Sequence, residues 1–229
     1  MKKADWIVVS LGGSLIAPKE GIDVKFLKEF HALADSLVAE GRRLLIVTGG
    51  GQTARQYQDA AKGAGVVKDE DLDWLGVHAT RLNAHLLRTL LRAAAAPRII
   101  TKPEEDELPD AKVIIAAGWK PGFSTDYDAA VLAKRLGCSR IVNLSNVDHV
   151  YSADPKKDPH ATRYERMAWT EFRALVGDSW KPGLNAPFDP VAARLCDEAG
   201  IEVAILSGKD LANARRALLG KGFEGTLIR

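Results

Sequence analysis

Two apolar runs near the start of the chain each end in a glycine turn, and this constrains the fold more than any other feature. Residues 7–11 lead into Gly-Gly-Ser at 12–14, and residues 44–48 lead into Gly-Gly-Gly at 49–51 and then a helical pattern. A strand that ends in glycines and feeds a helix leaves backbone N–H groups open, and the helix dipole adds positive potential there. We therefore expect both turns to face each other across one cleft that holds phosphate.

Strand-like apolar runs alternate with amphipathic helical patterns along the rest of the chain. The predicted strands are residues 6–11, 44–47, 98–101, 113–116, 140–144, 202–206 and 226–228. The predicted helices are residues 23–39, 52–62, 70–95, 127–136, 190–199 and 210–219. Near-continuous apolar strands separated by helices predict an α/β fold, a three-layer αβα sandwich with a mostly parallel central sheet. No linker divides the chain, so we expect a single domain over 1–229, with 102–111 as its most exposed connection.

Composition excludes several classes of protein. The 32 basic and 30 acidic residues nearly cancel without a long basic block, which argues against nucleic acid as a partner. No apolar stretch reaches membrane-spanning length and no signal peptide precedes the first strand, so we expect a cytoplasmic protein without a membrane partner. Cys138 and Cys196 lie far apart in the sequence, as expected for free thiols in a reducing compartment.

Several of these features also have simpler explanations. Gly49, Gly51 and Ala54 match the dinucleotide-binding pattern, with an acid about twenty residues further on, which leaves a nicotinamide-dependent oxidoreductase open. That acid falls at the front of a predicted helix, whereas the pattern requires the end of a strand. Either glycine turn alone is compatible with a plain tight turn, and Arg55 with an ordinary surface charge.

Residues 143–159 are a predicted buried strand that runs into a polar loop with one tyrosine, three acids and two lysines. Three further short segments stand out as possible motifs: Thr-Arg-Leu-Asn-Ala at 80–84, Pro-Gly-Phe-Ser-Thr-Asp at 121–126 and Asp-Pro-Val-Ala-Ala at 189–193. Together with the two glycine turns, they resemble the amino acid kinase family over nearly the whole chain, and the archaeal-type uridylate kinases within it most closely.

The resemblance implies an enzyme that phosphorylates UMP with ATP and takes part in pyrimidine biosynthesis. It implies an acceptor-binding lobe at about 1–120 and a nucleotide-binding lobe at about 121–229. It further implies a homo-oligomer, most simply a hexamer. Mg²⁺ would be carried by ATP rather than held by a metal site of the protein.

The resemblance also assigns roles to individual residues. The ATP phosphates would be held by Gly13, Ser14, Gly51 and Arg55. The adenosine would be framed by Ser145, Asn146, Tyr151 and Asp154. The acceptor would lie against Gly50, Asp73, Trp119, Lys120, Pro121, Gly122, Phe123, Ser124 and Thr125. The residues implied in catalysis are Arg55, Lys120 and Asp126, with Asp126 organising active-site lysines.

Three departures from the family pattern bear on these roles. Ser10 stands where most of the family has a phosphate-binding lysine, and His149 replaces a glycine of the nucleotide loop. Another cation must then offset the charge of the transferred phosphoryl group, and the candidates besides Arg55 are Lys120, Lys156, Lys181 and Lys209. Trp119, which replaces a small polar residue, and Trp180 bear on the identity of the acceptor. A different phosphate or carboxylate acceptor, and a non-catalytic nucleotide sensor, stay open as alternatives.

Overall fold

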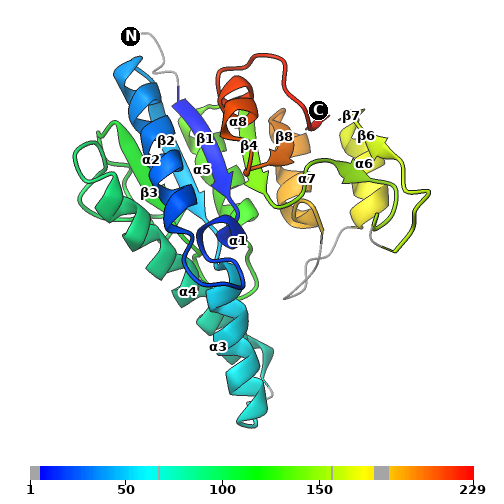
Figure 1. The fold of residues 1–229 in the computed structure, drawn as a ribbon, viewed down its shortest axis with the longest axis horizontal. Coiled ribbons are helices and arrows are strands. Elements are labelled where there is room, and N and C mark those ends of the chain that lie inside the picture. Colours follow the sequence, from blue (N-terminus) through cyan, green and yellow to red (C-terminus); the bar gives the residue numbers. More distant parts are fainter. Residues whose placement is uncertain (1–5, 67, 156, 178–185) are drawn as a thin grey trace.

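The centre of the protein is a twisted sheet of seven strands in the order β3-β2-β1-β4-β8-β9-β7 (Figure 1). This computed structural model describes residues 6–66, 68–155, 157–177 and 186–229. The strands are β1 (Trp6–Leu11), β2 (Arg43–Thr48), β3 (Val113–Ala116), β4 (Arg140–Ser145), β7 (Arg166–Met167), β8 (Glu202–Ser207) and β9 (Thr226–Ile228). All neighbours are parallel except β8 with β9, which confirms the predicted sheet. A separate hairpin pairs β5 (Val150–Tyr151) with β6 (Arg163–Tyr164).

Helices cover both faces of the sheet, as the αβα prediction requires. One face packs against α1 (Gly13–Ile16), α2 (Val24–Ala39), α4 (Asp69–Leu90) and α8 (Leu211–Leu218). The other face packs against α5 (Thr125–Leu136), α6 (Trp169–Val176) and α7 (Pro190–Ala199). Helix α3 (Gly51–Gly63) packs along α4 and projects beyond the sheet, so none of its residues is buried (Figure 1).

The strand β1 shows why the sequence reads as an almost unbroken apolar run. Ile7, Val9 and Leu11 point into the core beneath α2, whereas Val8 points into the core beneath α5. Side chains alternate between the two faces of a strand, so a strand covered on both faces must be apolar at every position.

The parallel arrangement gathers the ends of the central strands at one edge of the sheet. The N–H of Gly12, after β1, donates to the Leu144 carbonyl of β4 at 2.7 Å. The N–H of Gly49, after β2, donates to the Leu11 carbonyl at the end of β1 at 2.9 Å. Both glycine turns therefore lie at the carboxyl edge, where open α/β sheets bind their ligands.

Two of the predicted elements differ from the structure. The helix predicted to reach residue 95 ends at Leu90, and the strand predicted over residues 98–101 is wrong. Instead of a strand, the segment forms two isolated bridges to β3, Ala95 with Val113 and Ile100 with Ala116. Between them, Pro97 has no N–H to donate and Arg98 is exposed, so the pairing is interrupted.

Short elements were not predicted from the sequence at all: α1, the β5–β6 hairpin, β7 and α6. Each is too short to show a clear period, and their stability comes from packing such as that of the fully buried Phe172 on α6. The connection at 102–111 is mainly exposed, as predicted, and Asp106 fastens it by accepting from the N–H groups of Thr101 and Lys102.

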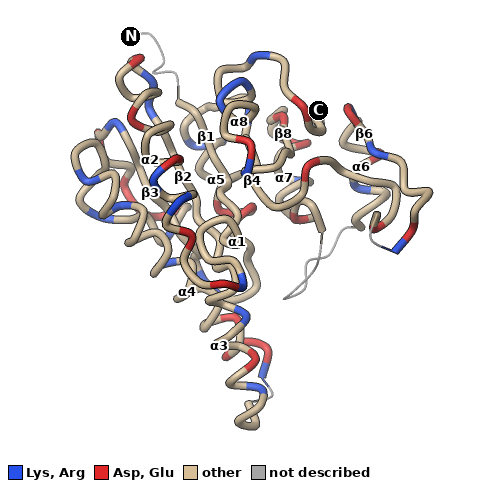
Figure 2. Tube along the Cα trace, viewed as in Figure 1, with Lys and Arg blue, Asp and Glu red and all other residues tan. Residues whose placement is uncertain are grey.

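Charges of both signs are interspersed over most of the chain trace, in keeping with the sequence balance (Figure 2). Cys138 and Cys196 are not joined in a disulfide, as expected. Within the residues that the structure describes, no helix has both the length and the hydropathy needed to cross a membrane.

Replacing Gly137 with alanine should destabilise the fold by about 1–2 kcal/mol, because Gly137 ends α5 in the left-handed conformation, at φ 64° and ψ 34°. Gly63→Ala is the matched control, since Gly63 lies in α3 without a positive φ and its added Cβ would meet no atom within 4 Å. Urea unfolding of both variants measures the difference. Equal losses would show that the backbone conformation at Gly137 is not what the fold requires.

Candidate functional site

The two glycine turns touch each other, backbone against backbone. A Cβ added to Gly13 would lie 2.1 Å from the Gly51 nitrogen, and one added to Gly51 would lie 2.2 Å from the Gly13 carbonyl oxygen. Ala17 joins them, because its N–H donates to Gly13 and its carbonyl accepts from Gln52. The expectation that the turns face each other across a gap is therefore wrong: the absence of side chains lets the two backbones meet and form one surface.

This joined surface presents open hydrogen-bond donors. Among the residues that the structure describes, the N–H groups of Gly13, Ser14, Gly50 and Gly51 have no hydrogen-bond partner. Gly50 is the N-cap and Gly51 the first residue of helix α3, whose dipole adds positive potential at that end. Unpaired N–H groups at a helix N-terminus form a binding site for an anion such as phosphate.

A cavity of about 730 Å³ opens beside these donors, and we call it the central cavity. It brings together most of the residues that the sequence analysis assigned to phosphate and acceptor binding: Ser14, Gly50, Gly51, Arg55, Asp73, Lys120, Phe123, Ser124 and Thr125. Its charged lining consists of three cations, Lys19, Arg55 and Lys120, and one acid, Asp73. The excess of positive charge favours an anionic ligand.

Lys19 was missed by the sequence analysis. It follows the short helix α1, which was not predicted, and only the folding of that segment against the start of α3 brings it to the cavity. A lone lysine in a loop carries no signal that sequence reasoning can use.

A second cavity, of about 440 Å³, lies along the loop after β4, and we call it the loop cavity. Tyr151 and Asp154 line it, as the resemblance implies for the adenosine site. Its walls also include Val147, Leu175 and Val176, which suit the flat face of an aromatic ring. Asn146 lines the central cavity, so the same loop contributes to both spaces.

The other assigned residues line neither cavity. These are Gly13, Trp119, Pro121, Gly122, Asp126 and Ser145. Gly122 still touches the site indirectly, because its N–H donates to an Asp73 carboxylate oxygen at 3.1 Å. Lys209 is exposed away from both cavities, while Lys156, Lys181 and Trp180 lie outside the described residues.

Trp119 does not line the central cavity itself, but its ring contacts Lys120, which does. Its side chain is buried, and its ring stacks at a tilt on Phe123 with the centroids 5.0 Å apart. The Lys120 ammonium lies 3.8 Å from the centroid of the Trp119 ring and 5.1 Å from that of Phe123. A cation over aromatic faces is held electrostatically, so the two rings restrict where Lys120 can place its charge.

Asp126 lies at the base of the site among uncharged partners. It accepts hydrogen bonds from the Ser10 hydroxyl at 2.8 Å, the Asn143 amide at 3.2 Å and the Asp189 N–H at 3.2 Å. Burial raises the pKa of Asp126 to about 6, and the nearby Asp189 carboxylate adds to the rise. Ser10, the departure from the family pattern, thus hydrogen-bonds to Asp126 in place of a lysine.

Three side chains of α4 hold the site together, and the sequence analysis did not assign them a role. The Asn83 amide donates to the carbonyls of Gly49 and Gly50, at 2.8 and 3.2 Å. Arg81 donates to the carbonyls of Gly118 and Trp119, and the Thr80 hydroxyl accepts from Gly118 N–H. These are the polar positions of the Thr-Arg-Leu-Asn-Ala motif, which was the available signal.

Asp128 completes this support from the other side. It is 1% exposed, and its Oδ2 accepts from the Trp119 N–H at 3.2 Å, while its Oδ1 has no partner among the described residues. Burial raises the pKa of Asp128 to about 8, with a smaller contribution from the charge of Asp126. The backbone next to Lys120, at Trp119, is therefore hydrogen-bonded to a carboxyl group that is protonated at neutral pH.

Comparison with known proteins identifies the family. Residues 5–207 match the sequence model of the Amino acid kinase family. The chain belongs to this family. A uridylate kinase from Methanospirillum hungatei is 39% identical over 226 residues, which cover 97% of this chain and 94% of that protein.

Two further relatives support the same relationship. A uridylate kinase from Pyrococcus abyssi is 35% identical over 225 residues, covering 97% of this chain and 98% of that protein. The crystal structure of a uridylate kinase from Archaeoglobus fulgidus superposes with a TM-score of 0.82 at 32% identity, covering 97% of this chain and 100% of that one. The fold of this amino acid kinase family member is thus the one that its sequence predicted.

Asp128→Asn should flatten the dependence of stability on pH. Because the folded-state pKa is raised from 3.8 to about 8, the folded chain keeps a proton that the unfolded chain loses, and the free energy of unfolding falls as pH rises between these values. Asparagine stays neutral and still accepts from Trp119. Relative to the unchanged protein, the variant should gain more than about 1.4 kcal/mol between pH 4 and 8.5, the equivalent of one pKa unit.

Urea unfolding at several pH values measures this gain. Asp106→Asn is the control, since Asp106 is half-exposed in a surface loop and caps two N–H groups outside the site. Parallel pH curves for Asp128→Asn and the unchanged protein would contradict a protonated Asp128.

Proposed function

We propose that this protein is a nucleoside monophosphate kinase that transfers the γ-phosphoryl group of ATP to UMP. One observation carries the proposal: the joined glycine turns bring the N–H groups of Ser14, Gly50 and Gly51, which have no partner within the described residues, to a cavity with excess positive charge. Full-length similarity to proteins named uridylate kinase specifies the substrates. The protein is a transferase of the amino acid kinase family.

ATP would bind with its phosphates at the glycine turns and its adenosine in the loop cavity. Gly13, Ser14 and Gly51 would donate backbone N–H groups to the phosphates, and Tyr151 and Asp154 would frame the nucleoside. Ser145 and Asn146 join the two regions, because they lie where β4 ends between the turns and the loop. Mg²⁺ would enter on the ATP phosphates and neutralise part of their charge.

UMP would occupy the other side of the central cavity. Asp73 can accept hydrogen bonds from the ribose hydroxyls, and Ser124 and Thr125 can donate from their side chains. We therefore propose an acceptor-binding lobe over about 1–120 and a nucleotide-binding lobe from about 121, joined through the common sheet. The acceptor turn from Gly118 to Thr125 lies between them.

The reaction needs little from the protein beyond placement and charge. An oxygen of the UMP phosphate is already an anion at neutral pH, so it can attack the γ-phosphorus in line without a general base. Asp126 serves no such role in this proposal, because its oxygens are occupied by Ser10, Asn143 and the Asp189 N–H. Catalysis then depends on aligning the two phosphates and neutralising the charge that gathers between them.

We assign that neutralisation to Arg55 and Lys120, with Lys19 as a third cation of the cavity wall. Arg55 lies on the first turns of α3, and its Nε donates to the Gln52 side chain at 2.9 Å, which leaves its outer nitrogens available. Lys120 is placed by the rings of Trp119 and Phe123. These cations take over the task that the family lysine, replaced here by Ser10, performs elsewhere.

The homo-oligomer remains a prediction, with a hexamer implied by the resemblance. It is supported by three large apolar side chains exposed on α3 and α4: Tyr57 at 61%, Trp74 at 38% and Leu82 at 62%. Contact between copies would cover them. The cytoplasmic location and the place in pyrimidine biosynthesis are proposed on the same ground of resemblance.

Arg55→Ala should lower kcat by a factor on the order of 10²–10³, the usual effect of removing one well-placed donor to a developing charge, while the protein stays folded. Arg92→Ala is the matched control, because Arg92 is exposed outside both cavities. ADP release with ATP and UMP measures the rate, and circular dichroism checks folding. Near-normal turnover of Arg55→Ala would contradict the assignment.

A panel of acceptors tests the substrate itself. We expect rapid ADP release with UMP and little with other nucleoside monophosphates, small phosphates or carboxylates. Turnover with a different acceptor alone would replace UMP as the substrate, and nucleotide binding without turnover would indicate the sensor alternative.

Trp119→Leu should raise the KM for UMP by about 2–5-fold, because Lys120 loses about 0.5–1 kcal/mol of cation–π attraction, while the KM for ATP stays nearly unchanged. Trp119→Phe should restore much of the loss, since it keeps an aromatic face. Steady-state kinetics with each substrate varied in turn measures the split. Equal increases in both KM values would point to general disruption of the turn instead.

A further inference from the structure

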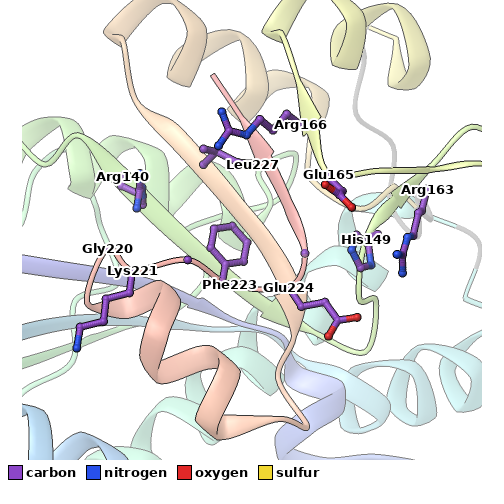
Figure 3. Close-up of a pocket in the computed structure, with 12 residues that line it drawn as sticks. Arg140, His149, Arg163, Glu165, Arg166, Gly220, Lys221, Phe223, Glu224 and Leu227 are labelled. Atoms are coloured by element: carbon purple, nitrogen blue, oxygen red, sulfur yellow. The ribbon is translucent and has the colours of Figure 1, made fainter.

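A third cavity, of about 540 Å³, lies apart from the two already described, over β9 and the loop that precedes it. Its floor is partly apolar, with Phe223 at the centre of the view and Leu227 above it (Figure 3). Lys221 lies on one side of Phe223, and Arg163 and His149 lie on the other (Figure 3). We call this space the basic cavity. Its volume falls within the range of small-molecule sites.

The lining of the basic cavity carries more positive than negative charge. Arg140 lines it but is paired with Glu202 at 2.6 Å. Arg163, Arg166 and Lys221 also line it, and none of the three forms an ion pair within the described residues. The acids of the lining, Glu165 and Glu224, are outnumbered. Guanidinium groups around an apolar floor suit a phosphate ester that carries a ring.

A buried polar side chain, His149, lies in the wall of the basic cavity. His149 is 2% exposed, and its Nδ1 lies 3.3 Å from an Asp148 carboxylate oxygen without the geometry of a hydrogen bond. Buried polar atoms are ordinarily hydrogen-bonded, so this one is unusual. The same histidine also lines the loop cavity, and its ring meets that of Tyr151 edge to face at 6.3 Å between centroids.

The strand beneath the basic cavity is tied to the loop cavity as well. Thr226 of β9 accepts a hydrogen bond from the Val150 N–H at 2.8 Å, next to Tyr151. Gly225 and Leu227, on either side of Thr226, line the basic cavity. A ligand there would press on the same short segment that frames the proposed adenosine site.

We propose that the basic cavity binds a small aryl or nucleoside-type phosphate ester, as a site separate from the kinase centre, and that its occupancy is transmitted to the loop cavity through His149 and Thr226. The coupling half of this inference rests on the proposed function, since it concerns ATP binding. The binding half rests on the cavity alone.

Phenyl phosphate is a suitable probe, because it has one ring and one phosphate. A non-hydrolysable ATP analogue and UMP are first added to saturation, so that the kinase centre is filled, and phenyl phosphate is then titrated while the melting temperature is followed. We expect a further, saturable rise, and a weaker effect of inorganic phosphate, which lacks the ring. A response that merely follows ionic strength in a sodium chloride control would overturn the proposal.

Paired charge variants locate the binding. Arg163→Gln with Arg166→Gln should weaken the binding of phenyl phosphate at least tenfold. Lys28→Gln with Arg92→Gln removes the same charge from exposed positions outside the cavity and should leave binding unchanged. Equal weakening in both double variants would overturn the assignment to this cavity.

Kinetics tests the transmission. Phenyl phosphate should change the KM for ATP by about fivefold in the unchanged protein, at the lower end of coupling between two sites, and not in Arg163→Gln with Arg166→Gln. An unchanged KM despite saturable binding would overturn the coupling. Failure of the kinase proposal itself is recognised separately, because the ATP analogue and UMP would then cause no rise in melting temperature before phenyl phosphate is added.

Discussion

The contact between Gly13 and Gly51 is the constraint on which the rest of the site depends. A side chain on either residue would occupy space already taken by the other backbone, so the turns after β1 and β2 can join only as glycines. The contact fixes the start of α3, and three residues of the turns, Ser14, Gly50 and Gly51, line the central cavity with N–H groups that have no partner among the described residues. An anion site built from backbone donors needs no movement to assemble when its ligand arrives, which is the property that stabilises a transferring phosphoryl group.

Buried polar groups connect this contact to the acceptor turn. Asn83 binds the carbonyls of the second glycine turn, while Thr80 and Arg81, on the same helix, bind the backbone of Gly118 and Trp119. Asp128 supports that backbone from α5 and is held neutral by burial. Both the second glycine turn and the turn at Gly118 and Trp119 are hydrogen-bonded to one helix, α4. This rigid helix therefore sets the distance between the two sides of the cavity.

Positive charge is placed by different means in different parts of the molecule. In the central cavity, Lys120 is held over Trp119 and Phe123, and Arg55 lies beside the glycine turns. In the basic cavity, Arg163, Arg166 and Lys221 form no ion pair among the residues that the structure describes. In both cavities an anionic ligand would neutralise these cations. Ser10, in the place of a lysine, leaves Asp126 with neutral hydrogen-bond partners.

The layers, the parallel sheet and the glycine turns at its carboxyl edge could be predicted from the sequence, because they follow from local features: unbroken apolar runs, a helical period of 3.6 and the position of the glycines. It also marked the residues of most of the central cavity through motifs. Three features are visible only in the tertiary structure. The two turns touch each other, Lys19 lines the central cavity, and Lys120 lies over the ring of Trp119. Those facts depend on which distant segments meet, and no local pattern encodes a contact between residues far apart in the chain.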